Sequence, residues 1–369
     1  DKTRKPPVLG QVRTSPWVRD RYTVELHQGL LKDILKGPSG SQTIDCFHGT
    51  LYKTALATAL HELAHVIDSS HRYSSSKQYR SLTDWSFGLL GASSKNTLTA
   101  RSPNAYEFKN PAENFAVNFE YFLLDPEFSC RRPATSRYFS DRFGFPASRA
   151  DCAPYYKVML SPNDRVVDIN PSRIYQIDYL FASKGEQLMS RWGHAMFHLN
   201  ICSPERKDTG HACRAEVSQH VVASYRANVM DPDVDVSSIK GTWKGLSGRY
   251  PSQIYYYSFA NIIQEYNQEE LRNLISLPLR LSAGQKAMLI EHFLEQYWGY
   301  QGRYSFLSNN CATEADDGLS SSVDHESSAI SPLGLLGDLI EAGLIDRSLL
   351  GPFPDQPADQ AIRNGYFYP

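Results

Sequence analysis

The sequence predicts an α+β protein with two domains, a mainly helical one at residues 1–160 and a mixed sheet-and-helix one at residues 161–369. Three observations support this prediction. A chain of 369 residues is long enough to bury two cores of ordinary size. Apolar residues recur at helical spacing in the first part, whereas short runs of β-branched and aromatic residues follow in the second part.

The first predicted helix carries LYKTALATALHELAHVID, which starts at Leu51. Its larger apolar residues recur every three or four positions, so we expect them to form one buried stripe. The stripe consists of Leu56, Leu60, Leu63 and Ile67. The histidines of this segment would then lie on an adjoining face of the helix.

A second helix is predicted for NPAENFAVNFEYFLL, which starts at Asn110. Asparagine is a favourable N-cap, and Pro111 takes the first helical position, where its missing N–H costs nothing. Glu113 then lies in the first turn, and the phenylalanines that follow can pack beneath it.

The second domain begins with four runs that are typical of strands and imply a sheet: DRVVDI, SRIYQIDYLFA, GHAMFHLNI and QHVVASYRAN. The segment from Ile254 to Tyr300 is expected to be mostly helical, and Ser282 is expected to cap the helix over AGQKAMLIEHFLEQYW. The run SSSVDHESSAISP is expected to be a loop.

Charge and hydropathy restrict the partners of the chain. The formal net charge is -2 and the pI is near 6.6, so no basic field is expected to attract nucleic acid or anionic lipid. No apolar run approaches the roughly 20 residues of a membrane helix. The opening DKTRKPPVLG lacks the apolar core of a signal peptide, so we expect a periplasmic or secreted chain from which a targeting segment has been removed.

The six cysteines include no CxxC pair, so a cysteine-only zinc site is not expected. Cys130 with Cys152, and Cys202 with Cys213, would each close a polar, loop-like segment. Each bridge would contribute about 3 kcal/mol in the chain-entropy model. Disulfides favour an extracytoplasmic compartment.

The segment HELAHVIDSSH, which starts at His61, is the strongest chemical signal. Residues four apart on a helix are neighbours, so the imidazoles of His61 and His65 can reach one ion. Glu62 can then meet a metal-bound water rather than the metal, as a general base requires. Zn²⁺ in a hydrolytic site takes three protein ligands and keeps one position open for water.

Two residues compete to be the third ligand. His71 completes HExxHxxxxxH, which resembles the metzincin peptidases, although that family has glycine where this chain has Asp68. Glu113 on the second helix could face the first, which resembles the gluzincin peptidases. We favour Glu113 and keep His71 as the alternative. Asp68 could orient a ligand imidazole and Tyr106 could donate to an oxyanion, but both are weaker candidates.

A second constellation lies in the later domain. On the strand predicted over RWGHAMFHLNI, His194, Met196 and His198 share one face. Cys311 follows two asparagines, which are good caps, so its thiol is expected at a helix N-terminus, where the pKa of a thiol falls. A thiolate beside a histidine is the minimum for cysteine nucleophilic catalysis. Alternatively, Cys311 pairs with Cys46, which the two local bridges leave over.

From about residue 166 onward, the chain resembles the Lnb amino-terminal periplasmic domain family through WGHAMFHL, EYNQEELRNLISLPLRLS and YSFLSNNCATE. The order of histidine before cysteine is similar to that of circularly permuted papain-like hydrolases, such as the lecithin retinol acyltransferase group. This resemblance implies that Cys311 is a nucleophile and His194 its base, with His198 or His220 as the orienting partner.

The earlier part resembles zinc-peptidase segments attached to such domains in bacterial envelope proteins, through HELAHVID, RSPNAYEF, NPAENFAVNFEYFLLDPEF and CRRP. It implies a zincin-like, gluzincin-like domain. We therefore expect a zinc-dependent peptidase of the cell envelope that acts on a peptide or protein, including cell-wall or lipid-linked peptides. The alternatives are a cysteine amidase or acyl hydrolase that uses Cys311 and His194, and a scaffold that binds an envelope partner without turnover.

Overall fold

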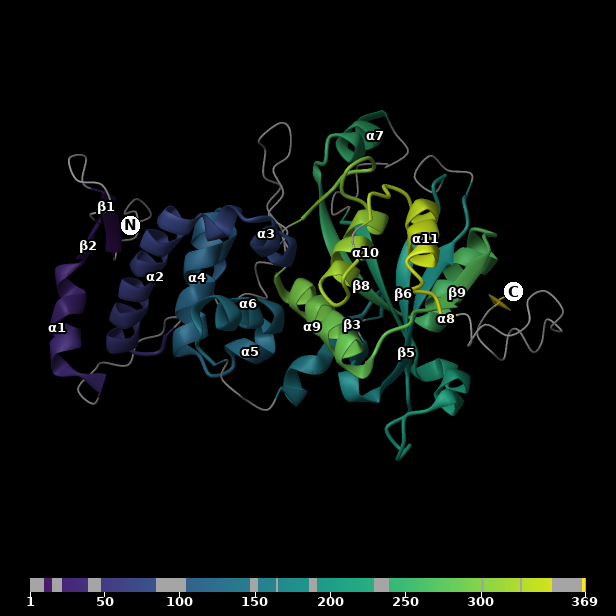
Figure 1. Ribbon diagram of the computed structural model, residues 1–369, viewed down its shortest axis with the longest axis horizontal. Helices are drawn as coiled ribbons and strands as arrows, with labels where there is room; N and C mark the ends of the chain where they lie inside the picture. The colour runs from purple at the N-terminus through teal and green to yellow at the C-terminus, as the bar shows by residue number, and fades with distance from the viewer. Residues whose placement is uncertain are drawn as a thin grey trace. The chain divides into compact units, whose positions relative to one another are not determined.

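A computed structural model shows the fold of the chain (Figure 1). The structure describes residues 10–14, 22–38, 48–83, 104–146, 152–163, 165–185, 191–228, 239–299, 302–325, 327–346 and 367–368. The chain divides into two compact units, with the main boundary after Ala150. The first unit is mainly helical and the second combines a large sheet with helices, so the predicted α+β class is confirmed.

The first unit combines a small sheet with a group of helices. Strands β1 and β2 pair antiparallel in a two-stranded sheet. The elements are β1 (Gly10–Thr14), β2 (Tyr22–Leu26), α1 (Gln28–Lys36), α2 (Leu51–His71), α3 (Lys77–Thr83), α4 (Pro111–Leu124), α5 (Phe128–Arg131) and α6 (Pro133–Phe143).

Helix α2 forms as predicted, but its buried face differs in part. Leu56 and Leu63 are exposed, whereas Ala55, Ala57 and Ala64 are buried. Alanine has a short side chain, so this face can come close to its neighbours in the unit. The predicted stripe is therefore confirmed only in part: Ile67 packs against the aromatic core and Leu60 is partly buried, but Leu56 and Leu63 are not covered. Spacing alone does not show how far the neighbouring helix covers an apolar face.

Helix α4 begins as its sequence predicts. Asn110 accepts a hydrogen bond from the backbone N–H of Glu113, and Pro111 is the first helical residue. Ten consecutive residues of α4, from Glu113 to Phe122, are buried. Several of them join one aromatic core with α2, α3 and α6: Ala64, Tyr79, Phe115, Phe119, Phe122 and Phe139. This core fixes the pairing of α2 and α4.

The second unit is built on a nine-stranded sheet whose main order is β11-β9-β5-β6-β7-β8-β3-β4, with β10 on β8. The strands are β3 (Lys157–Leu160), β4 (Arg165–Asp168), β5 (Ile174–Ala182), β6 (His194–Ile201), β7 (Val221–Ala227), β8 (Tyr250–Ser258), β9 (Leu274–Pro278), β10 (Arg303–Tyr304) and β11 (Phe367–Tyr368). All four predicted strands form. The unit starts before the predicted boundary at residue 161, because β3 pairs with both β4 and β8.

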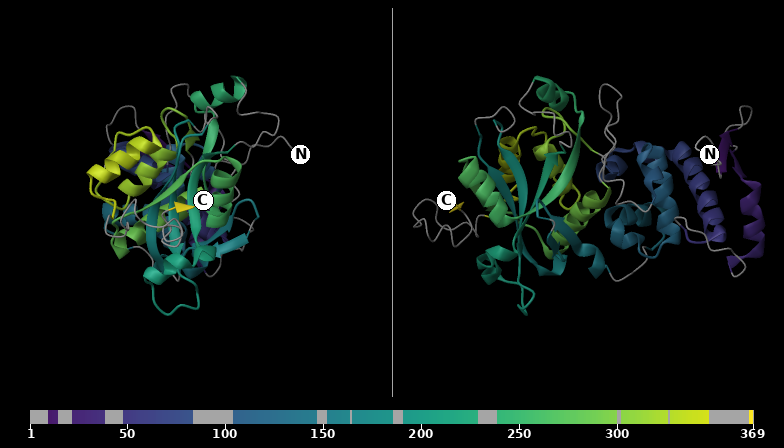
Figure 2. Two further views of the ribbon diagram at one scale, coloured as in Figure 1. Left: turned by 90° about the vertical axis from the view of Figure 1, so that its right-hand side faces the viewer. Right: turned by 180° about the vertical axis from the view of Figure 1, so that it is seen from behind.

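Helices cover both faces of this sheet (Figures 1 and 2). They are α7 (Ile239–Leu246), α8 (Phe259–Ile263), α9 (Ala283–Gly299), α10 (Cys311–Ser320) and α11 (Pro332–Glu341). Residues of α9, α10 and α11 pack with Ala195, Phe197 and Leu199 of β6 on one face. Residues of α8 pack with Met196 on the other.

The segment from Ile254 to Tyr300 is less helical than predicted. It includes the end of β8 and all of β9, because these aromatic and aliphatic residues pair with neighbouring strands. The hydroxyl of Ser282 accepts a hydrogen bond from the N–H of Gln285 at the start of α9, so the predicted cap is confirmed.

The disulfides of the structure agree with the two local bridges that the sequence predicts. Cys202 and Cys213 are joined, and Cys130 and Cys152 are both disulfide-bonded. Cys311 is a buried free thiol, so its predicted alternative pairing with Cys46 is wrong. Cys46 itself lies outside the described residues. Among the helices that the structure describes, none is long and apolar enough to cross a membrane.

Candidate functional site

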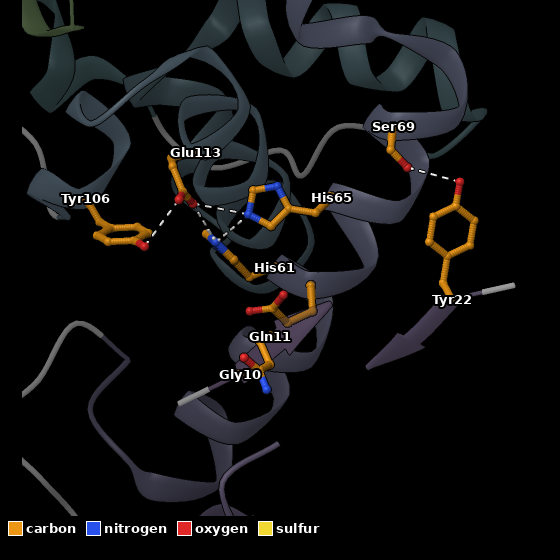
Figure 3. A pocket seen from close by; sticks show the side chains of 9 residues that line it. Gly10, Gln11, Tyr22, His61, His65, Ser69, Tyr106 and Glu113 are labelled. Atoms are coloured by element: carbon orange, nitrogen blue, oxygen red, sulfur yellow. Dashed lines mark hydrogen bonds and ion pairs between the residues drawn. The ribbon is translucent and has the colours of Figure 1, made fainter. Parts of the chain in front are cut away.

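Helices α2 and α4 bring His61, His65 and Glu113 together (Figure 3). Nε2 of His61 and Nε2 of His65 each lie 3.1 Å from Oε2 of Glu113, and 3.1 Å from one another. The two histidines are one helical turn apart on α2, and Glu113 is in the first turn of α4. The three side chains are partly or largely buried, and the short distances show that their donor atoms converge on one small space.

This arrangement fits a zinc ion. Ligand atoms bound tetrahedrally at about 2.1 Å from zinc lie about 3.4 Å from one another. The donor atoms of His61, His65 and Glu113 are already within 0.3 Å or so of that spacing. Two imidazole nitrogens and one carboxylate oxygen are also a ligand set that hydrolytic zinc sites use.

The second oxygen of Glu113 is held by two donors. Oε1 accepts a hydrogen bond from Nζ of Lys109 at 2.8 Å and from the hydroxyl of Tyr106 at 3.2 Å. Burial opposes ionisation, but the bonds from His61, His65 and Lys109 hold the pKa of the Glu113 carboxyl well below its ordinary value. Glu113 is therefore ionised, with Oε2 directed at the histidines.

His61 is oriented from behind by a second carboxylate. Its Nδ1 lies 3.5 Å from Oε2 of Glu120, whose other oxygen is 3.6 Å from Nε2 of His48. Burial lowers the pKa of His61, yet the carboxylates of Glu113 and Glu120 outweigh burial and raise it to about 9. A carboxylate on the far nitrogen fixes the ring and directs Nε2 toward the shared space, as it does for histidines that bind metals.

A pocket of about 390 Å³ opens at this cluster and is lined by both helices and by the small sheet. Glu62 lines it and is buried, one residue after His61 on α2. Strand β1 forms another wall: a Cβ built on Gly10 would lie 3.0 Å from Oε1 of Glu62. Farther along α2, the hydroxyl of Ser69 lies 3.2 Å from the hydroxyl of Tyr22, the first residue of β2 (Figure 3). The pocket therefore holds the candidate ligands and the candidate base.

Two other candidates lie outside this cluster. His71 is exposed at the end of α2 and stacks on Tyr73, with ring centroids 5.1 Å apart. Helix α2 continues through Asp68 and turns only at Arg72, which adopts the left-handed conformation with φ 56°. Asp68 accepts hydrogen bonds from the N–H and the hydroxyl of Ser74, so it fastens the next turn of chain and orients no histidine.

In the second unit, Cys311 begins α10 as predicted. Asn310 caps the helix and accepts hydrogen bonds from the N–H groups of Ala312 and Thr313. Burial, however, raises the pKa of the Cys311 thiol, and the bonding of the sulfur to the backbone of Ala195 only partly opposes this. The expected low thiol pKa is therefore wrong, because burial outweighs the helix terminus.

The structure does not bring Cys311 and His194 into contact. Cys311 packs with the core on the Ala195 face of the sheet. His194 points to the opposite face, where it stacks on Tyr266 and its Nε2 lies 2.9 Å from the hydroxyl of Ser224. Burial, together with the nearby charges of two arginines, holds the pKa of His194 well below its ordinary value.

His198 and His220 form a separate buried network on the same face as His194. Nε2 of His198 lies 3.0 Å from Nδ1 of His220, and its Nδ1 lies 3.1 Å from the hydroxyl of Ser276. Ser276 in turn donates to the carboxylate of Asp178. Burial, helped by neighbouring positive charge, lowers the pKa of both histidines. Among the described contacts, neither histidine orients His194.

Sequence reasoning missed three residues of the first site: Glu120, Lys109 and Gly10. Glu120 could have been found, because it lies seven residues, or two helical turns, after Glu113 and therefore on the same face of α4. Lys109 stands four residues before Glu113, but its bond crosses the start of the helix. Nothing in the sequence pairs Gly10 with α2.

Comparison with protein families divides the chain into two parts that resemble the two units of the structure. Residues 12–86 and 81–152 match a domain of unknown function (DUF7844), and residues 166–341 match the Lnb N-terminal periplasmic domain. No curated protein and no solved structure matched the chain. The periplasmic family and the disulfides fit an extracytoplasmic protein. Residues 166–341 of the second unit are therefore similar to the Lnb N-terminal periplasmic domain, and the preceding unit is similar to the DUF7844 domain.

Proposed function

We propose that this protein is a zinc-dependent hydrolase of the cell envelope that cleaves peptide bonds in its first unit. The observation that carries the proposal is the convergence of His61, His65 and Glu113, whose donor atoms all lie within 4.8 Å of one another beside Glu62. A partly buried pair of histidines facing a carboxylate is costly unless the groups share a proton or a cation. A dication satisfies all three at once.

In this proposal, His61, His65 and Glu113 would hold the ion at the pocket. When bound, zinc lowers the pKa of a water molecule and polarises the scissile carbonyl. Glu62 accepts the proton of the attacking water and later gives it to the leaving amine. Tyr106 lines the pocket, and to stabilise the oxygen that becomes negative in the transition state its hydroxyl would have to exchange Oε1 of Glu113 for that oxygen.

Lys109 and Glu120 position the ligands. Lys109 occupies one oxygen of Glu113, so that the carboxylate offers only Oε2 to the ion. Glu120 holds the ring of His61 through Nδ1. Because both partners act on a ligand rather than on the substrate, we expect them to affect zinc affinity more than substrate affinity.

The test is hydrolysis of a peptide library by the purified, zinc-loaded chain. Glu62→Gln should abolish cleavage and keep the zinc, because the amide cannot accept the proton. Cys311→Ala should cleave like the unaltered chain. Removal of zinc with a chelator should stop cleavage, and added zinc should restore it. Cleavage that survives Glu62→Gln and the chelator would overturn the proposal.

The thiol alternative rests on Cys311, which is a free cysteine at the start of α10. Under this alternative the protein would be an amidase or acyl hydrolase, with Cys311 as nucleophile and His194 as base. It requires His194 and the thiol, which lie on opposite faces of the sheet, to meet after a rearrangement. Treatment with iodoacetamide separates the two proposals, because a thiol enzyme would lose its activity and the zinc enzyme would keep it. If neither Glu62→Gln nor Cys311→Ala reduced the biological activity, the scaffold alternative would stand.

A further inference from the structure

Seven of the exposed large apolar side chains of the second unit belong to segments that meet at one end of its sheet. We call this set the apolar rim. Its members are between 42% and 83% exposed: Trp192, Trp243, Leu246, Leu271, Leu307, Ile330 and Leu333. Single exposed apolar residues are ordinary on a protein surface, but a group of this kind marks an interaction surface.

One part of the apolar rim surrounds the N-terminus of α10. The N–H of Phe306, next to Leu307, donates to the carbonyl of Gly245 in α7, the helix that carries Trp243. The side-chain amide of Asn310, the cap of α10, donates to the carbonyls of Phe306 and Ile330. These bonds join α7, the turn before α10 and the start of α11.

The other part of the apolar rim adjoins the start of β6. Trp192 precedes β6 by two residues. Leu271 precedes Arg272, whose Nε donates to the carbonyl of Ser183, just after the end of β5. Because Ala182 of β5 pairs with the first residue of β6, Trp192 and Leu271 flank the same strand ends.

The N-terminus of α10 connects the two parts, because α10 contacts β6 and Cys311 belongs to the same core cluster as Ala195 of β6. The start of α10 and the start of β6 therefore lie together. Figure 1 shows α7 at an end of this unit's sheet. The apolar rim thus gathers around one end of the sheet, and no side chain of the rim is needed for the core.

Exposed basic side chains lie close to members of the apolar rim along the chain. Lys184 lies two residues after the end of β5, Arg191 lies three residues before β6, and Arg249 directly precedes β8. All three are exposed and take part in no ion pair within the described part of the chain. Of the two acidic residues before Leu271, Glu270 is paired with Arg272, and Glu269 accepts a hydrogen bond from the side-chain amide of Gln264. The net charge of -2 therefore conceals a local basic set.

We infer that the apolar rim docks the second unit on the surface of an anionic phospholipid bilayer. Tryptophan prefers the boundary between headgroups and acyl chains, and leucine and isoleucine can enter the acyl layer. The flanking lysine and arginines complement anionic headgroups. The inference depends on neither the zinc site nor thiol catalysis. It modifies the expectation from net charge alone, which suggested no attraction to anionic lipid.

The test is binding of the full chain to vesicles of phosphatidylcholine with and without phosphatidylglycerol. The unaltered chain should co-sediment with the anionic vesicles, and its tryptophan fluorescence should shift to shorter wavelength. Trp192→Ala and Trp243→Ala should each weaken partitioning about tenfold, given the apolar area each removes. Leu35→Ala is the matched control, because Leu35 is an exposed apolar residue of α1 in the other unit.

Three outcomes would overturn the inference. The unaltered chain could fail to bind either vesicle, or the two tryptophan variants could bind as well as the control. The chain could also self-associate in sedimentation without lipid and lose that association in the tryptophan variants, which would make the apolar rim an interface between copies. A Lys184→Gln, Arg191→Gln, Arg249→Gln variant should lose the preference for anionic vesicles while its residual binding remains.

Discussion

Zinc binding to the first unit should depend steeply on pH, because the ion must displace a proton from His61. In the metal-free chain, the carboxylates of Glu113 and Glu120 raise the pKa of His61 to about 9, against an ordinary value of 6.5. The ring is therefore protonated at pH 7, and a protonated imidazole cannot bind a metal. Zinc affinity should rise with pH until about pH 9 and then become constant.

The magnitude follows from the distance between pH 7 and that pKa. Each pH unit below about 9 costs a factor of about ten in apparent affinity, or about 1.4 kcal/mol, so the affinity at pH 7 should be about 100-fold below its limit. An imidazole with the ordinary pKa would reach its limit before about pH 8. The raised pKa of His61 therefore predicts that zinc affinity still increases with pH between about pH 8 and 9, where an unperturbed histidine would give a constant affinity.

Two assays measure this effect. Competition with a chelator of known zinc affinity gives the dissociation constant between pH 6.5 and 9.5. Calorimetry at pH 7 in two buffers with different heats of ionisation gives the number of protons released, which should be about one for His61. A dissociation constant that stays flat between pH 7.5 and 9, with no proton released, would refute the reasoning.

Three further predictions follow from the two units. Glu120→Gln, measured above pH 9 where protons no longer compete, should weaken zinc binding about 10- to 100-fold, whereas the exposed Glu127→Gln should not change it. Gly10→Ala should keep the zinc but slow peptide cleavage about 10- to 100-fold, because its Cβ would lie 2.7 Å from Cγ2 of Thr58 and 3.0 Å from Oε1 of Glu62 and would displace both side chains; an unchanged rate would count against Glu62 as the base. Cys311 should react slowly with iodoacetamide at pH 7 in the folded chain and quickly in denaturant, and fast labelling of the folded chain would contradict the raised thiol pKa.

The parts of the fold that local chemistry decides could be predicted from the sequence. Asn110 and Asn310 cap α4 and α10 because their side chains reach backbone N–H groups only two or three residues away. The spacing of His61 and His65 likewise places both rings on one face of α2. The four strands around residues 165–227 carry enough β-branched and aromatic residues to be recognised.

Features that depend on packing between distant segments could not be predicted. The buried face of α2 is the one with Ala64, because it meets the aromatic core around α4, whereas the larger Leu63 remains exposed. Along the chain, strands β8 and β9 adjoin helical segments of similar composition. Only the pairing of these strands with other strands distinguishes them from the helical segments. The pKa of the Cys311 thiol depends on how deeply α10 is buried, which its cap does not reveal.

The central claim is that His61, His65 and Glu113 bind one zinc ion, and the most direct test is the zinc content of three purified proteins. These are the unaltered chain, Glu113→Ala and His71→Ala, each supplied with zinc and checked for folding by circular dichroism. We expect about one zinc per chain in the unaltered protein and in His71→Ala, and none in Glu113→Ala. Loss of zinc with His71→Ala alone, or no zinc in the unaltered chain, would contradict the account.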